Sequence, residues 1–123
     1  MADLAVEALD SAIRDHVIAF NNLGFCTFAS CAGHEWAPAD YPYISFIDYN
    51  VKIATAARHY GLDVRDCRDM KAQGYGYALA IYARNEGDTE GFVKALNALL
   101  QFLYVSKKVE DELFSKCFKE NEQ

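Results

Sequence analysis

The chain has 123 residues, of which 52% are hydrophobic and 24% are charged, and its formal net charge is −6. A chain of this length buries enough surface to fold as one domain without disulfides or metal ions, and its apolar content excludes intrinsic disorder. No apolar run approaches the roughly 18 residues of a membrane span, and a pI of about 4.9 argues against binding of nucleic acid through its phosphates. We therefore expect residues 1–123 to form a single domain with no membrane contact and no direct nucleic-acid binding.

The cellular compartment is predicted from the N-terminus and the cysteines. Acidic residues stand at positions 3, 7 and 10, where a secretory signal would carry Lys or Arg. The four cysteines lack the dense spacing of a disulfide framework. We expect a cytoplasmic protein whose cysteines are reduced.

The predicted elements combine three helices with four short strands. Apolar residues recurring every three to four positions indicate the helices, and runs of β-favouring residues between glycines and prolines indicate the strands. In chain order they are a helix over 3–22, strands over 25–32 and 43–48, a helix over 51–60, strands over 62–67 and 75–84, and a helix over 88–119. This order predicts an α+β two-layer sandwich, in which an antiparallel sheet of about four strands carries helices on one face.

The C-terminal helix has more apolar surface than one core needs. It carries two stripes that do not coincide, one of Phe92, Leu96, Leu99 and Leu103 and one of Phe102, Val109, Leu113 and Cys117. A helix that is apolar nearly all round is either central in its own domain or shared with a second chain. We therefore expect a homodimer formed through the C-terminal helix.

The most distinctive segment follows the first predicted strand. It concentrates aromatic, acidic and imidazole side chains in a loop at a strand end, where binding residues are common. Between Asp15 and Val51 the chain has no Lys or Arg, so this stretch is expected to present an anionic surface to basic partners. The predicted partner-binding residues are His34, Glu35, Trp36, Asp40, Tyr41 and Tyr43.

The same loop admits two chemical alternatives. Cys31 and His34, with Cys26 and His59, have part of a zinc-binding pattern, but only one half of the usual paired motif is present. Cys31 beside His34 also has the composition of a nucleophile with its base, although no third, orienting residue stands out. In the plainer interpretation the cysteines are small buried residues. We predict no metal, no cofactor and no catalytic residue.

A second candidate surrounds the net-positive stretch 51–71. Arginines fit anionic ligands, but Arg65 and Arg68 each stand beside an aspartate, so local ion pairs are the simpler expectation. The alternative ligand site that combines both regions contains Cys31, His34, Arg58 and Tyr77.

A short motif resembles a known pattern. The run Thr27-x-x-Ser30-Cys31-x-Gly33-His34, followed by Pro42-Tyr43-Ile44-x-Phe46, is similar to the SC-x-GH and PYI-x-F pattern of small uncharacterised proteins of phages and bacterial mobile elements. It is more distantly similar to the Ser-Cys-Ser-Gly motif of the wybutosine-synthesising tRNA methyltransferase family, in which an arginine replaces His34. The first resemblance implies a compact, phage-borne accessory protein that binds and blocks something.

These observations lead to one functional hypothesis and one alternative. The first is a small acidic, non-enzymatic protein that binds and blocks a protein partner, such as a bacterial defence or nucleic-acid-handling complex. The alternative is a small enzyme or ligand-binding domain with a Cys/His/Arg site.

Overall fold

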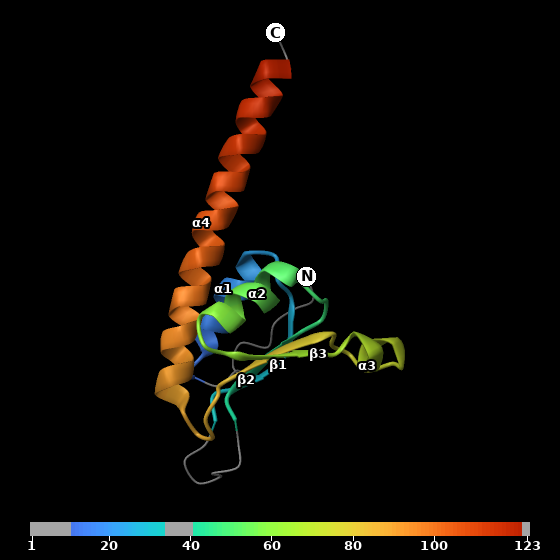
Figure 1. The fold of residues 1–123 in the computed structure, drawn as a ribbon, viewed down its shortest axis with the longest axis vertical. Coiled ribbons are helices and arrows are strands. Elements are labelled where there is room, and N and C mark those ends of the chain that lie inside the picture. The colour runs from blue at the N-terminus through green and yellow to red at the C-terminus, as the bar shows by residue number, and fades with distance from the viewer. Residues whose placement is uncertain (1–10, 34–40, 122–123) are drawn as a thin grey trace.

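The structure, a computed structural model, describes residues 11–33 and 41–121, with side chains as far as residue 117. A four-stranded antiparallel sheet carries the packed helices on one side (Figure 1). The elements in chain order are α1 (Arg14–Asn22), β1 (Thr27–Cys31), β2 (Tyr43–Phe46), α2 (Val51–His59), β3 (Asp63–Asp66), α3 (Arg68–Ala72), β4 (Leu79–Tyr82) and α4 (Thr89–Asn121). The predicted α+β class, with its antiparallel sheet and long C-terminal helix, is confirmed.

The sheet has the strand order β1-β2-β4-β3, and every neighbouring pair is antiparallel. Ile44 pairs with Ile81 and Phe46 with Leu79 across the two central strands. Since side chains opposite one another in a ladder share a face, these four form one apolar layer, and each is at most 1% exposed.

The helices complete the core above this layer. α1 contributes Val17 and Phe20, which are at most 1% exposed, and the Phe20 ring meets the Phe46 ring edge-on at 5.2 Å. α4 contributes Phe92, Leu96, Leu99 and Leu103, all at most 2% exposed. Fully burying each such side chain contributes roughly 1.5–3 kcal/mol, so the first predicted stripe of α4 is the one that anchors it to the domain.

A polar clasp ties α1 to β1. Asn21 is only 6% exposed, and its amide nitrogen donates to the Val17 carbonyl at 2.8 Å and to the Thr27 hydroxyl at 2.9 Å. Its amide oxygen accepts the Thr27 backbone N–H at 3.2 Å. A buried amide must be paired in this way to offset its loss of water, and the pairing fixes the start of β1 against the helix.

The sequence did not predict α3. Charges alternating with other residues favoured an edge strand up to residue 67, and β3 confirms most of that strand. The chain then turns, because Asp66 accepts a hydrogen bond from the Arg68 backbone N–H at 3.0 Å and pairs with its guanidinium. Hydrogen bonds from Arg68 hold the pKa of the Asp66 carboxyl below its usual range. The ion pair expected of Arg68 is thus confirmed, whereas Arg65 lies over the Tyr82 ring.

The strand predicted over 75–84 is shorter in the structure. The Tyr75 backbone N–H donates to the Met70 carbonyl at 3.1 Å and closes a turn behind α3. The ladder therefore begins only at Leu79. The predicted start of the first helix lies outside the described residues, and the described helix begins at Arg14.

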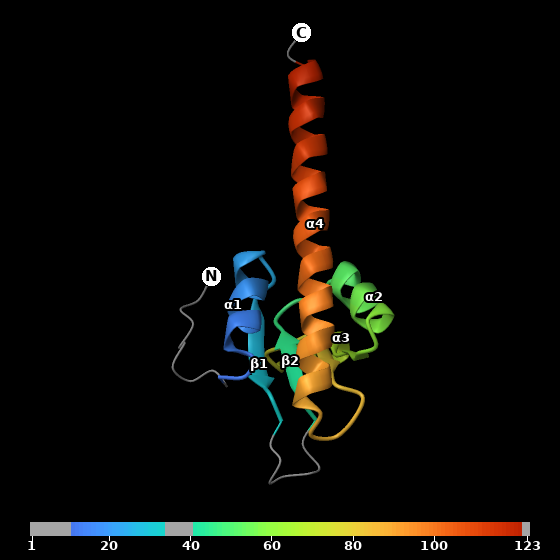
Figure 2. The same cartoon turned by 90° about the vertical axis from the view of Figure 1, so that its left-hand side faces the viewer.

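α4 is much longer than the domain it covers. Its 33 residues correspond to about 50 Å at 1.5 Å per residue. Figures 1 and 2 show its first half packed over the sheet and its second half extending past α1 and α2.

Candidate binding surface on the open face of the sheet

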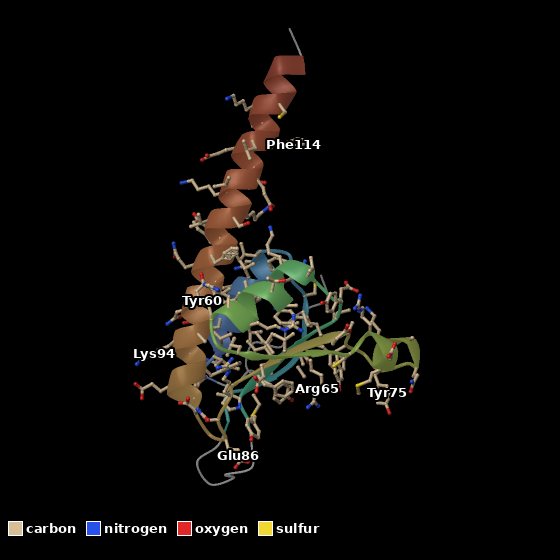
Figure 3. The ribbon with its side chains drawn as sticks, in the orientation of Figure 1. Tyr60, Arg65, Tyr75, Glu86, Lys94 and Phe114 are labelled. Atoms are coloured by element: carbon tan, nitrogen blue, oxygen red, sulfur yellow. The ribbon has the colours of Figure 1, made fainter. Side chains whose placement is uncertain are left out.

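No helix in the described parts of the chain covers the other face of the sheet (Figure 1). Register identifies the side chains there: Tyr43 pairs with Tyr82, and Ser45 and Arg65 each pair with Ala80. These residues alternate with the core residues of the same strands, so they point away from the helices. Figure 3 shows Arg65 on the side of the sheet opposite α2. We call this surface the open face and define it by Phe28, Tyr43, Arg65, Tyr77 and Tyr82.

The large side chains of the open face pack on one another. The Phe28 and Tyr77 rings stack at 5.6 Å between centroids, and the Tyr43 and Tyr82 rings lie 5.7 Å apart. The Arg65 guanidinium carbon sits 5.3 Å from the centre of the Tyr82 ring. Ring pairs and cation–ring contacts of this kind hold side chains in defined positions, so the surface is ordered before anything binds to it.

Small residues form the floor beneath these rings. Ser45 is 3% exposed, Cys67 is 1% exposed and Ala80 is fully buried. Burial on a face without a helix requires cover from neighbouring side chains, because a side chain on an uncovered sheet is otherwise solvated. The aromatic rings around these small residues therefore shield them from water, and the outer sides of the rings are the surface that a partner would contact.

A β-bulge shapes the β1 side of the open face. The pairing of β1 with β2 shifts between Thr27 and Ala29. The Ser45 hydroxyl closes the irregularity, since it accepts the Ala29 N–H at 3.0 Å and donates to the Ala29 carbonyl at 3.1 Å. The Thr27 side chain faces α1, where its hydroxyl accepts a hydrogen bond from Asn21. Phe28, the next residue, therefore projects from the other side of the sheet and remains 54% exposed. Bulges often redirect a side chain in this manner.

Gly76 makes room for the Phe28 ring. A Cβ at this position would overlap that ring. The absence of a side chain lets the segment before β4 pass under the aromatic pair. This is a structural requirement for glycine at a surface position, and it belongs to the open face.

The electrostatics of the face follow from its partial burial. Burial raises the pKa of the Tyr82 hydroxyl above 10.0, while the positive charge of Arg65 opposes that shift. Burial also raises the pKa of the Cys67 thiol. Both groups are therefore neutral near pH 7, and Cys67 is not an activated thiolate.

A polar hollow of about 370 Å³ adjoins the open face at the β3 edge. Tyr41 lies on one side of it, and its hydroxyl donates to a Glu86 carboxylate oxygen at 3.3 Å. The negative charge of Glu86 raises the pKa of Tyr41. The hollow is lined by Tyr41, Asp63, Val64, Arg65, Tyr82, Ala83 and Arg84.

Two of the predicted partner-binding residues meet at this surface. Tyr43 belongs to the open face and Tyr41 lines the adjoining hollow. The other predicted members, His34, Glu35, Trp36 and Asp40, lie outside the described residues.

The alternative ligand site is only partly brought together. Cys31 pairs with Tyr43 in the ladder, and Tyr77 is stacked on Phe28. Arg58 belongs to α2, which packs on the opposite side of the sheet, and His34 lies outside the described residues. The four cysteines form no disulfide, and within residues 11–33 and 41–117 no group of three His, Cys, Asp or Glu side chains is placed to hold a metal ion.

In the stretch without Lys or Arg, the carboxylate of Asp48 is paired with a basic side chain from elsewhere in the chain. Lys71 of α3 binds Asp48 at 2.7 Å and also donates to the Ile47 carbonyl at 2.8 Å. A basic side chain distant in the sequence thus neutralises Asp48. In the part of the chain that the structure describes, no helix combines the length and apolar character of a membrane span.

Sequence reasoning missed two residues of the open face, Phe28 and Tyr82, and considered Arg65 only for an anion site or a local ion pair. In an unbroken strand over 75–84, Tyr77 would share a face with Leu79. It does not, because the chain is not yet in the β4 ladder at residue 77. The available signal was Tyr82, a large ring at the end of an otherwise small-residue face.

Comparison with protein-family models, with curated proteins and with solved structures finds no match to this chain.

Proposed function

We propose that the protein is a non-enzymatic binding protein that holds a protein partner on its open face. The observation that carries the proposal is a set of four packed rings and one guanidinium, gathered over a floor of small buried residues on a sheet face that no described helix covers. The rings come from both outer and central parts of the sheet, so the fold brings them together.

The chemistry of this face favours a protein partner. Tyr and Arg are enriched among the residues that dominate protein–protein binding energy. Rings that already pack on one another lose little conformational entropy when a partner arrives. Aromatic rings with arginine also stack on nucleic-acid bases, but a net charge of −6 opposes the approach of phosphates.

The proposal includes an inhibitory role. A net charge of −6 attracts basic surfaces over a distance, and a complex that handles nucleic acid keeps such a surface for its substrate. A partner of this kind, for example a bacterial defence complex, would be blocked by an acidic protein bound across its groove.

The test compares affinity capture by the wild type with capture by two open-face variants, Phe28→Ser and Arg65→Glu. Tyr104→Ser is the matched control, because Tyr104 is 59% exposed on α4 and Phe28 is 54% exposed. A partner retained by the wild type and the control should bind each open-face variant at least about tenfold more weakly. Far-UV circular dichroism establishes that all four proteins are folded.

Two results would overturn the proposal. In one, the open-face variants retain every partner of the wild type with unchanged affinity. In the other, the wild type binds a single-stranded oligonucleotide and both open-face variants lose that binding, which would make the face a base-stacking platform.

A further inference from the structure

The second half of α4 carries an apolar stripe that nothing in the described protomer covers. Val105, Val109 and Leu113 are 46%, 48% and 58% exposed. At about 100° per residue, they share one side of the helix with Ala98 and Phe102. We call these five residues the outer stripe. The core residues of α4 lie on a different side, so the outer stripe is not needed to hold the domain together.

The outer stripe runs into a groove at the base of the projecting helix. Two hollows of about 420 and 500 Å³ adjoin one another where α2 approaches α4. Tyr60 and Phe102 line both of them, and their rings lie 6.5 Å apart. Val105 lines the outer hollow. The apolar surface therefore continues from the domain onto the projecting helix without a break.

An isolated helix of this length gains stability from packing. Residues 104–121 extend from the domain, as the position of Phe114 in Figure 3 illustrates. Isolated helices of fewer than about 12–15 residues are marginal in water, and in proteins most of a helix's stability comes from packing of an apolar face. A partner along the outer stripe would supply that contact.

The charges beside the outer stripe identify the partner. One flank carries Lys108, then Glu112 one turn later and Lys116 after another turn. In an antiparallel pair of identical helices each flank meets the same flank of the other helix in reverse order. Lys108 of each copy then faces Glu112 of the other, twice in one interface.

A parallel pair lacks this match. It would bring the Lys108 flank against the opposite flank, which carries Ser106 and Glu110. The Glu110 carboxylate is already bound by Lys52 of α2, and hydrogen bonding to Lys52 lowers its pKa. Glu110 is therefore engaged within its own chain.

We infer that the protein forms a homodimer in which the projecting halves of α4 pair antiparallel along their outer stripes. With Lys108 opposite Glu112, Leu113 of each copy packs between Val105 and Val109 of the other. The C-terminal turns of each helix reach towards the groove at Tyr60 and Phe102 of the second copy. The contact is isologous, as expected of a two-fold dimer, and it leaves the open face of each sheet accessible.

Sedimentation of the full chain tests the charge register. The wild type should be a dimer, and Lys108→Glu and Glu112→Lys should each weaken association roughly tenfold or more, because two attractive contacts become repulsive. The double variant Lys108→Glu/Glu112→Lys restores both contacts and should return to within about threefold of the wild type. Lys107→Glu is the matched control, since Lys107 pairs with Asp111 on the side of α4 away from the outer stripe.

Two further measurements separate dimer loss from misfolding and from a parallel pair. Leu113→Glu should give monomers with the circular dichroism of a folded domain. Mild oxidation should give no rapid disulfide between copies, because the two exposed Cys117 thiols would lie about 21 Å apart along the helix axis in the antiparallel pair. A monomeric wild type, a double variant no better than the single ones, or rapid Cys117 cross-linking overturns the inference.

Discussion

Replacing Ser45 by alanine tests whether one buried hydroxyl holds the bulge that shapes the open face. Ser45 is 3% exposed, and its hydroxyl makes two hydrogen bonds with the backbone of Ala29, at 3.0 and 3.1 Å. The alanine removes both bonds to the backbone of a partly buried strand. At about 1 kcal/mol for each lost bond, the free energy of unfolding falls by about 2 kcal/mol. For a domain of this size the melting temperature falls by roughly 6–12 °C.

Urea unfolding followed by far-UV circular dichroism measures this loss. Ser30→Ala is the control, because it deletes the same hydroxyl from a half-buried position of β1 and should change the free energy of unfolding by less than about 0.5 kcal/mol. The Ser45 variant should also bind the open-face partner more weakly, because the bulge sets the outward position of Phe28. If the two alanine variants are equally stable, the hydroxyl does not hold the bulge and the reasoning fails.

Three other predictions concern the core, the pH dependence and the thiols. Asn21→Leu should lower the free energy of unfolding by about 2–4 kcal/mol, because a backbone N–H of β1 and other polar partners lose their bonds; a change below about 1 kcal/mol in urea unfolding would contradict this. Burial raises the pKa of Tyr82 above 10.0, so its contribution to stability is complete below pH 10 and is lost as the pH rises through the folded-state pKa; Tyr82→Phe should flatten the decline measured between neutral and strongly alkaline pH, and an unchanged slope would refute the assignment. Iodoacetamide should modify exposed Cys117 first and buried Cys67 last in peptide mapping; a Cys31 that reacts faster than Cys117 would favour the nucleophile alternative.

Much of the fold could be predicted from local patterns. Apolar residues such as Leu96, Leu99 and Leu103 recur at helical spacing, and that spacing predicts a helix with these residues on one of its apolar sides. Alternation over residues 75–84 separated Leu79 and Ile81 from the small residues between them, and the structure shows that the side with Leu79 and Ile81 faces the core. These patterns depend only on the spacing of apolar residues along each helix or strand, so they can be recognised without knowing what the element packs against.

The candidate site was less accessible to such reasoning. Tyr41 and Tyr43 were predicted because they follow an unusual loop, whereas Phe28 and Tyr82 were not. A bulge turns Phe28 outward, and strand order alone puts β4 beside β2 and brings Tyr82 against Tyr43. The residue pattern within one strand does not predict which other strands will lie beside it in the sheet.

The sequence by itself determined which side chains are apolar and at what spacing, where α1, α2 and α4 end to within a few residues, and that α4 has two apolar sides. Only the tertiary structure decided how those surfaces are used. It placed Lys71 on Asp48 and so removed a charge that the sequence suggested was free for a partner. Among the residues that the structure describes, it also left one sheet face without a helix and one helix stripe exposed, because pairing between distant segments settles which apolar surfaces a chain covers itself.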